Sequence, residues 1–61
     1  MSVFEVLAER CAEREQALRA AIGDATAALR AREPERALRI LARVEHLAAA
    51  QLRERGTLED L

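Results

Sequence analysis

The chain has 61 residues, of which 51% are hydrophobic and 34% charged, and its formal net charge is −1. A domain of this size buries only about 60% of the surface of its unfolded chain, so a disulfide, a metal or a partner subunit usually supports it. Cys11 is the only cysteine and His46 the only histidine, which excludes an internal disulfide and leaves too few ligands for a structural zinc site.

Alanine, leucine, glutamate and arginine dominate the composition, as is typical of long helices and coiled coils. We therefore predict an all-α protein. No segment approaches the roughly 18 consecutive apolar residues of a membrane span, and the N-terminus lacks the basic-then-apolar pattern of a secretion signal. The expectation is a cytoplasmic protein without a membrane partner.

The first helix is predicted over residues 3–32, because Ser2 and Glu5 form a capping box at its start. At 100° per residue its large apolar residues fall within a wedge of about 60°, a narrow seam for another helix. The seam keeps its phase across Gly23 and Asp24, which favours one continuous helix, although this pair could also end one helix and start another. The seam residues are Phe4, Leu7, Cys11, Leu18, Ile22 and Leu29.

Pro34 predicts a turn at 33–34 and a second helix over 34–55, with Gly56 as a left-handed C-cap. The short link makes the two helices an antiparallel hairpin of residues 1–56, which becomes a four-helix bundle if it dimerises. The apolar arc of the second helix approaches half its circumference, more than one neighbouring helix covers. Its large members are Leu38, Ile40, Leu41, Val44, Leu47 and Leu52.

Residues 57–61 are predicted to form a short acidic tail. With about 30 and 22 residues, the first helix outreaches the second by roughly 12 Å at 1.5 Å per residue. The end that carries Phe4 would then project into solvent. We expect the tail to lay Leu58 and Leu61 over it, with a partner completing the cover.

No catalytic motif is present: the sequence has no glycine-rich phosphate loop, no paired cysteines, and no lysine or tyrosine. We predict a protein that is not an enzyme and needs no cofactor. Cys11 is expected to be a small buried hydrophobe, or alternatively to meet Cys11 of a second copy in a redox-sensitive dimer. His46 is expected to be a solvated surface residue, with a pH switch or a ligand role as the alternative.

Arg14 and Glu15 interrupt the apolar seam of the first helix. They could reach outward and bury only their aliphatic stems. Alternatively, they could form a polar layer that fixes the register of an oligomer.

Charges follow helical spacing on both helices. An acidic line is formed by Glu5, Glu9 and Glu13. Like charges at such spacings repel one another, so the acidic line is expected to pair across the hairpin with the basic residues of the second helix. Otherwise the basic stripe is a docking surface for phosphate or for an acidic partner helix. The stripe comprises Arg32, Arg36, Arg39, Arg43, His46 and Arg53.

The size limit and the surplus apolar arc favour a non-enzymatic protein–protein interaction module. It would be a homo-oligomeric bundle, or an adaptor or chaperone-like accessory subunit of a larger complex. The expected partner is a second copy of the chain, an amphipathic helix of another protein, or both. The alternative is an RNA- or DNA-binding hairpin that uses the basic stripe. The net charge of −1, the absence of lysine and the single aromatic residue, Phe4, argue against nucleic acid.

Overall fold

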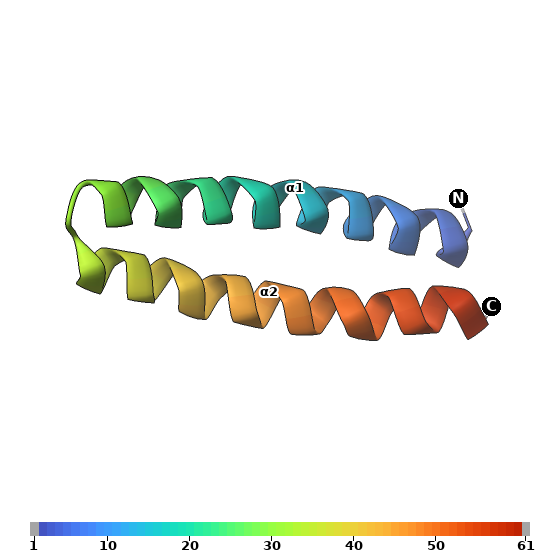
Figure 1. Cartoon of the computed structure of the whole chain (residues 1–61). Helices are drawn as coiled ribbons and strands as arrows, with labels where there is room; N and C mark the ends of the chain where they lie inside the picture. Colours follow the sequence, from blue (N-terminus) through green and yellow to red (C-terminus); the bar gives the residue numbers. More distant parts are fainter. Residues whose placement is uncertain (1, 61) are drawn as a thin grey trace.

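The computed structural model describes residues 2–60 as two α-helices joined by a tight turn. Helix α1 spans Val3–Arg30 and helix α2 spans Pro34–Asp60. Figure 1 shows the helices antiparallel and side by side, with both ends of the chain at the same end of the hairpin. The predicted all-α antiparallel hairpin is confirmed. Within residues 2–60, neither helix carries a stretch apolar enough to cross a membrane.

Helix α1 begins at the predicted cap and runs without a break. The Ser2 hydroxyl accepts a hydrogen bond of 3.2 Å from the backbone N–H of Glu5. The helix continues through Gly23 and Asp24, so the prediction of one continuous helix is confirmed. A Cβ atom added at Gly23 would meet nothing within 4 Å, which means that no close approach requires glycine there. Seam contacts on both sides of Gly23 offset its low helix propensity, about 1 kcal/mol below that of alanine.

The turn is a C-capping motif with an arginine at its left-handed position. Helix α1 ends at Arg30, not at the predicted residue 32, because Arg32 takes a φ of 59°. The N–H of Arg32 donates to the carbonyl of Leu29 at 3.1 Å, and the N–H of Glu33 donates to that of Ala28 at 2.9 Å. These two bonds satisfy carbonyls that the end of a helix leaves open. Glycine or asparagine usually occupies this position, so Arg32 is strained by about 1–2 kcal/mol.

The prediction that the second helix stops at Arg55 is wrong. Gly56 has no positive φ, so it is not a left-handed cap. Helix α2 continues to Asp60, and the Thr57 hydroxyl donates to the carbonyl of Arg53 at 3.2 Å, inside the helix. The reason is packing: Leu58 takes a half-buried position facing α1, where it adds apolar burial.

The predicted overhang and the folded-back tail are therefore also wrong. The helices have 28 and 27 residues and end level with each other. Phe4 is 55% exposed. Leu58 lies in the helix, and the proposed cover by Leu61 lies outside the described residues.

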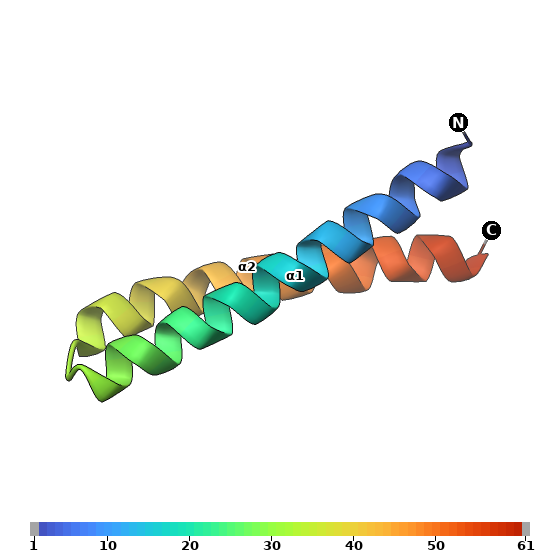
Figure 2. The same ribbon diagram turned by 90° about the horizontal axis from the view of Figure 1, so that it is seen from above.

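The helices meet along a seam with the alternating three- and four-residue spacing of a coiled coil. The figures agree in placing the helices side by side, and Figure 2 shows them crossing, with their free ends diverging. All seam residues are buried or half-buried. On α1 they are Leu7, Cys11, Arg14, Leu18, Ala21, Ala25 and Ala28, and on α2 Ala37, Ile40, Val44, Leu47, Gln51, Glu54 and Leu58.

Near the turn the seam consists of alanines. Ala25, Ala28 and Ala37 are at most 3% exposed, whereas Ile22 and Leu29 are more than half exposed. The first-helix seam predicted from large side chains is thus shifted toward the turn. Small residues let two helix backbones approach closely, and the larger side chains then point to the side. A straight-helix projection hides this shift, because a seven-residue repeat drifts by about 20° per repeat from the ideal helix.

Candidate functional site: a polar layer and two unlike faces

A polar layer crosses the seam in the half of the hairpin near its free ends. The Arg14 guanidinium binds the Glu54 carboxylate through two hydrogen bonds, Nη1 to Oε2 at 2.8 Å and Nη2 to Oε1 at 3.2 Å. Nη1 also donates to Gln51 Oε1 at 3.3 Å, and Gln51 Nε2 donates to the carbonyl of Cys11 at 2.9 Å. All four residues are therefore tied together across the two helices.

The layer is electrostatically matched. The hydrogen bonds from Arg14 hold the pKa of the Glu54 carboxyl below its ordinary value, against the opposing effect of burial. The same contact raises the pKa of Arg14. No buried side-chain nitrogen or oxygen atom within residues 2–60 lacks a hydrogen-bond partner. A half-buried charged pair is tolerated when it is hydrogen-bonded in this way.

This layer resolves the question of Arg14 and Glu15. Arg14 points into the hairpin and pairs with α2, whereas Glu15 is exposed and accepts a hydrogen bond of 2.9 Å from Arg19 on its own helix. The polar layer fixes the register of the two helices within one chain, since a slip by one turn would leave the Arg14 charge unpaired. Cys11 is buried in this layer, as expected for a small hydrophobe, with its Sγ 4.0 Å from Glu54 Oε2.

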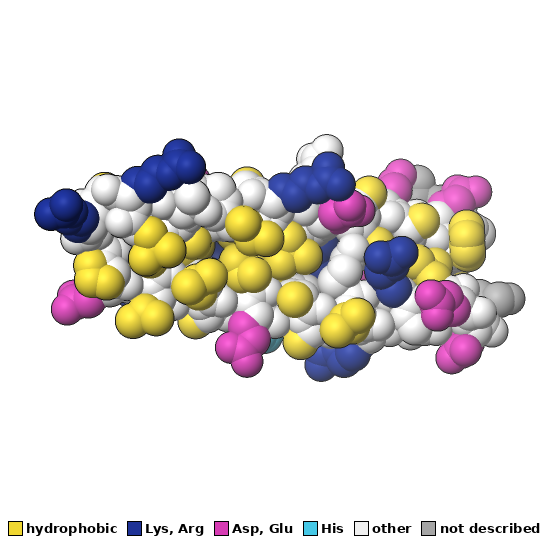
Figure 3. Space-filling model, in the orientation of Figure 1, with side chains coloured by type: hydrophobic (Ala, Val, Ile, Leu, Met, Phe, Trp, Pro, Cys, Tyr) yellow, Lys and Arg dark blue, Asp and Glu magenta, His cyan; other side chains and the backbone are white. Residues whose placement is uncertain are grey.

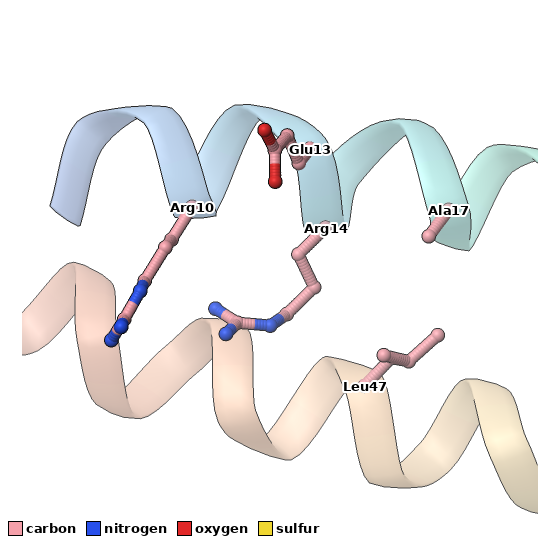
Figure 4. A pocket seen from close by; sticks show the side chains of 5 residues that line it. All are labelled: Arg10, Glu13, Arg14, Ala17 and Leu47. Atoms are coloured by element: carbon pink, nitrogen blue, oxygen red, sulfur yellow. The ribbon is translucent and has the colours of Figure 1, made fainter. Parts of the chain in front are cut away.

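Polar groups collect on one face of the hairpin. A hollow is lined by Ala17 and Asp24 of α1 and by Arg43 of α2, so these residues share one face. A second hollow adjoins it, and Figure 4 shows Arg10 and Arg14 reaching from α1 toward α2 at its edge, with Leu47 pointing up from α2. We call this the polar face; its charged residues are Arg10, Asp24 and Arg43, with Ala17 between them.

The opposite face is apolar. Residues of the polar face come one position before seam residues, as Asp24 precedes Ala25. Ile22, Leu29 and Leu41 come one position after seam residues, which places them on the other flank of the seam. They are 52%, 58% and 44% exposed. Leu38 and Leu52 extend this row on α2. We call this the apolar face; it comprises Ile22, Leu29, Leu38, Leu41 and Leu52.

Figure 3 shows one face of the hairpin, on which hydrophobic side chains form a band across both helices, densest in the half near the turn. Basic side chains lie along the α1 edge of that half, and acidic side chains lie along the α2 edge. The band has no cover within the described part of the chain.

The predicted pairing between the acidic line and the basic stripe is wrong. Within residues 2–60 the ion pair that crosses the hairpin is Arg14–Glu54. Arg19–Glu15 lies within α1, and Arg36–Glu33 joins the start of α2 to the turn. The residues of the acidic line are exposed and take part in none of these ion pairs.

The basic stripe is exposed along its whole length. Arg43 belongs to the polar face and Arg36 lies seven residues before it in the same row. The rest of the stripe lies at the turn or farther round α2, and comprises Arg32, Arg39, His46 and Arg53. The stripe and the apolar face therefore occupy opposite flanks of α2.

The apolar residues named from the sequence divide between two surfaces. Leu7, Cys11, Leu18, Ile40, Val44 and Leu47 pack inside the hairpin. The exposed ones are Phe4, Ile22, Leu29, Leu41 and Leu52. Sequence reasoning missed Gln51 and Glu54 as partners of Arg14. A seven-residue register from Ala37 to Leu58 places both on the seam side of α2.

Among residues 2–60, no group of three histidine, cysteine or carboxylate side chains gathers as a metal site would require. The candidate site is the apolar face, whose large aliphatic side chains are 44% to 74% exposed. Comparison with protein-family models, with curated proteins and with solved structures gave no match, so the function is inferred from these two faces alone.

Proposed function

We propose that the chain is a non-enzymatic helical interaction module that docks helices onto its apolar face. The observation that carries this proposal is the row of five large aliphatic side chains on one side of the hairpin, each 44% to 74% exposed. Single exposed leucines are ordinary, but a contiguous apolar patch rimmed by charges marks an interaction surface. The docked helix would extend the hairpin toward a bundle of three or four helices.

The surface area of the chain supports the same proposal. The hairpin exposes 4873 Å², whereas a compact monomer of 6.8 kDa exposes about 4,000 Å² by the scaling of area with mass. The excess, 4873 minus about 4,000, is about 900 Å². A specific protein interface buries about 800 Å² on each partner. The uncovered surface is therefore of the size that one docked partner would bury.

Replacing two leucines of this face tests the proposal. Leu38 and Leu41 are 66% and 44% exposed, so a docked helix would newly bury about as much as one whole leucine side chain. That burial contributes about 1.5–3 kcal/mol. We expect Leu38→Gln with Leu41→Gln to weaken docking by about tenfold to a hundredfold. The matched control is Ala42→Gln with Ala49→Gln, on the exposed outer side of the same helix.

The readout is cross-linking from a photoreactive residue at Arg55, which is exposed and follows the seam residue Glu54, on the same flank as the apolar face. In cells of the native host, the wild-type face should cross-link to a helical protein, either a second copy or another chain. The yield should fall in the double leucine variant and persist in the alanine control. No cross-linked protein, or equal yields from both variants, would contradict the proposed function.

A further inference from the structure

We infer that the partner on the apolar face is a second copy of this chain, packed face to face with both turns at the same end. This inference rests on the proposed function and names its partner. The result is a four-helix bundle in which α1 of each copy lies over α2 of the other. The two-fold axis runs along the hairpin, so the contact is isologous.

The argument starts from the register of the hairpin. Arg14 lies beside Gln51, and Cys11 lies beside Glu54. A residue one position later on α1 is therefore level with a residue one position earlier on α2. Ala28 and Ala37, both essentially unexposed, meet in the same register near the turn. The height of any residue along the hairpin can thus be compared between the two helices.

The charges on the two edges of the apolar face match at these heights. Arg19 on the α1 edge is level with residue 46 of α2, next to Glu45 on the α2 edge. Glu45 takes part in none of the ion pairs of residues 2–60, whereas Arg19 is paired with Glu15 of its own helix at 2.9 Å; both Arg19 and Glu45 are exposed. The basic α1 edge and the acidic α2 edge agree with the arrangement in Figure 3.

A rotation about the long axis of the hairpin places α1 of one copy over α2 of the other without changing the heights. Arg19 then faces Glu45 of the second copy. Each contact occurs twice because of the symmetry. Opposite charges at the edges of a helical interface select the partner and its orientation.

The apolar residues match in the same arrangement. Ile22 is level with residue 43 of the second copy, two residues from its Leu41. Leu29 is level with residue 36, two residues from its Leu38. The competing face-to-face arrangement, with the turns at opposite ends, lays α1 over α1. It brings the two basic edges together and the two acidic edges together, which charge repulsion disfavours.

A charge-exchange experiment tests this arrangement. In a homodimer of Arg19→Glu, the new carboxylate at position 19 would face Glu45 of the other copy at both contacts. In a homodimer of Glu45→Arg, Arg19 would face a second guanidinium at position 45 at both contacts. In a mixed dimer of the two variants, both contacts are attractive. Each variant alone should therefore dimerise more weakly than the wild type, and mixing them should restore the dimer.

The readout is native mass spectrometry of the two variants, one labelled with ¹⁵N, after mixing in equal amounts at low salt. Each exposed ion pair changes an equilibrium constant by about 1.5- to 5-fold. We expect the mixed dimer to exceed the statistical 1:2:1 distribution by at least about threefold, and the excess to shrink in high salt. A control mixture of wild-type chains with and without ¹⁵N should give the statistical distribution.

Two results would overturn the inference. A statistical mixture of the variants would mean that Arg19 does not face Glu45 of a second copy. A wild-type chain that light scattering shows to be a monomer at about 100 μM, where a dimer of micromolar Kd would be nearly complete, would exclude the homodimer. If that monomer is still cross-linked to another protein through the apolar face, the proposed function stands and only this inference fails. If no protein is cross-linked either, both fail.

Discussion

The alanine contact next to the turn provides the sharpest test of the fold. Ala28 is 0% exposed and Ala37 only 1% exposed, so the two helix backbones approach closely where these residues meet. Ala28→Leu adds three carbon atoms at a position without free space. Overpacking of this kind costs about 1–3 kcal/mol. The free energy of unfolding of a 61-residue chain is itself only about 3–9 kcal/mol, so the loss should be large.

The measurement is thermal unfolding followed by circular dichroism, with all chains at one concentration because an assembling chain melts at a concentration-dependent temperature. In a domain this small, 1 kcal/mol lowers Tm by about 4–8 °C, so Ala28→Leu should lower it by about 5–20 °C. Ala27→Leu is the matched control, since Ala27 is exposed on the same helix. The control should stay within about 0.5 kcal/mol of the wild type. Equal melting of the two variants would refute the close alanine contact.

Two further predictions concern single residues of α2. Gly56→Ala should raise the free energy of unfolding by about 0.5–1 kcal/mol in urea titrations, because Gly56 lies inside the helix with open space around it; a loss of stability would instead indicate a left-handed cap. Glu54→Gln should lower Tm at neutral pH. Because the pKa of Glu54 is lowered by folding, its contribution is complete above the ordinary value of 4.5 and is lost as the pH falls through the lowered value. The Tm difference from the wild type should therefore shrink below about pH 4.5, and a difference that stays constant down to pH 2 would contradict the role of the Arg14 pair. Glu59→Gln, an exposed carboxylate, is the control.

Much of the fold could be predicted from local signals in the sequence. The Ser2 cap and Pro34 each act within one turn of helix, and the structure places helix starts at both. The end of α2 could not be predicted, because the low propensity of Gly56 competes with burial of Leu58 against a helix distant in sequence. The left-handed φ of Arg32 was missed because glycine or asparagine usually marks that position, and arginine gives no such local signal; hydrogen bonds to the carbonyls of residues 28 and 29 hold the turn there.

The candidate site was only partly predictable. A surplus of apolar surface on α2 follows from its composition, and the structure shows Leu38, Leu41 and Leu52 exposed. On α1 the large side chains suggested a seam that includes Ile22 and Leu29, but the alanines displace both to the apolar face. The partners of Arg14 depend on the cross-helix register, which residues 37 and 40 positions away determine.

The turn also bears on how two copies could exchange segments. A chain with a strained residue between two long helices can relieve that strain by straightening into one helix and pairing its second half with another chain. Arg32, with its φ of 59°, supplies the strain. Pro34 opposes the straightened form, because proline inside a helix removes a hydrogen bond and collides with the carbonyl four residues earlier, at a cost of about 3 kcal/mol. That penalty exceeds the strain at Arg32. Pro34 thus disfavours the straightened form, so we expect two copies to meet as closed hairpins.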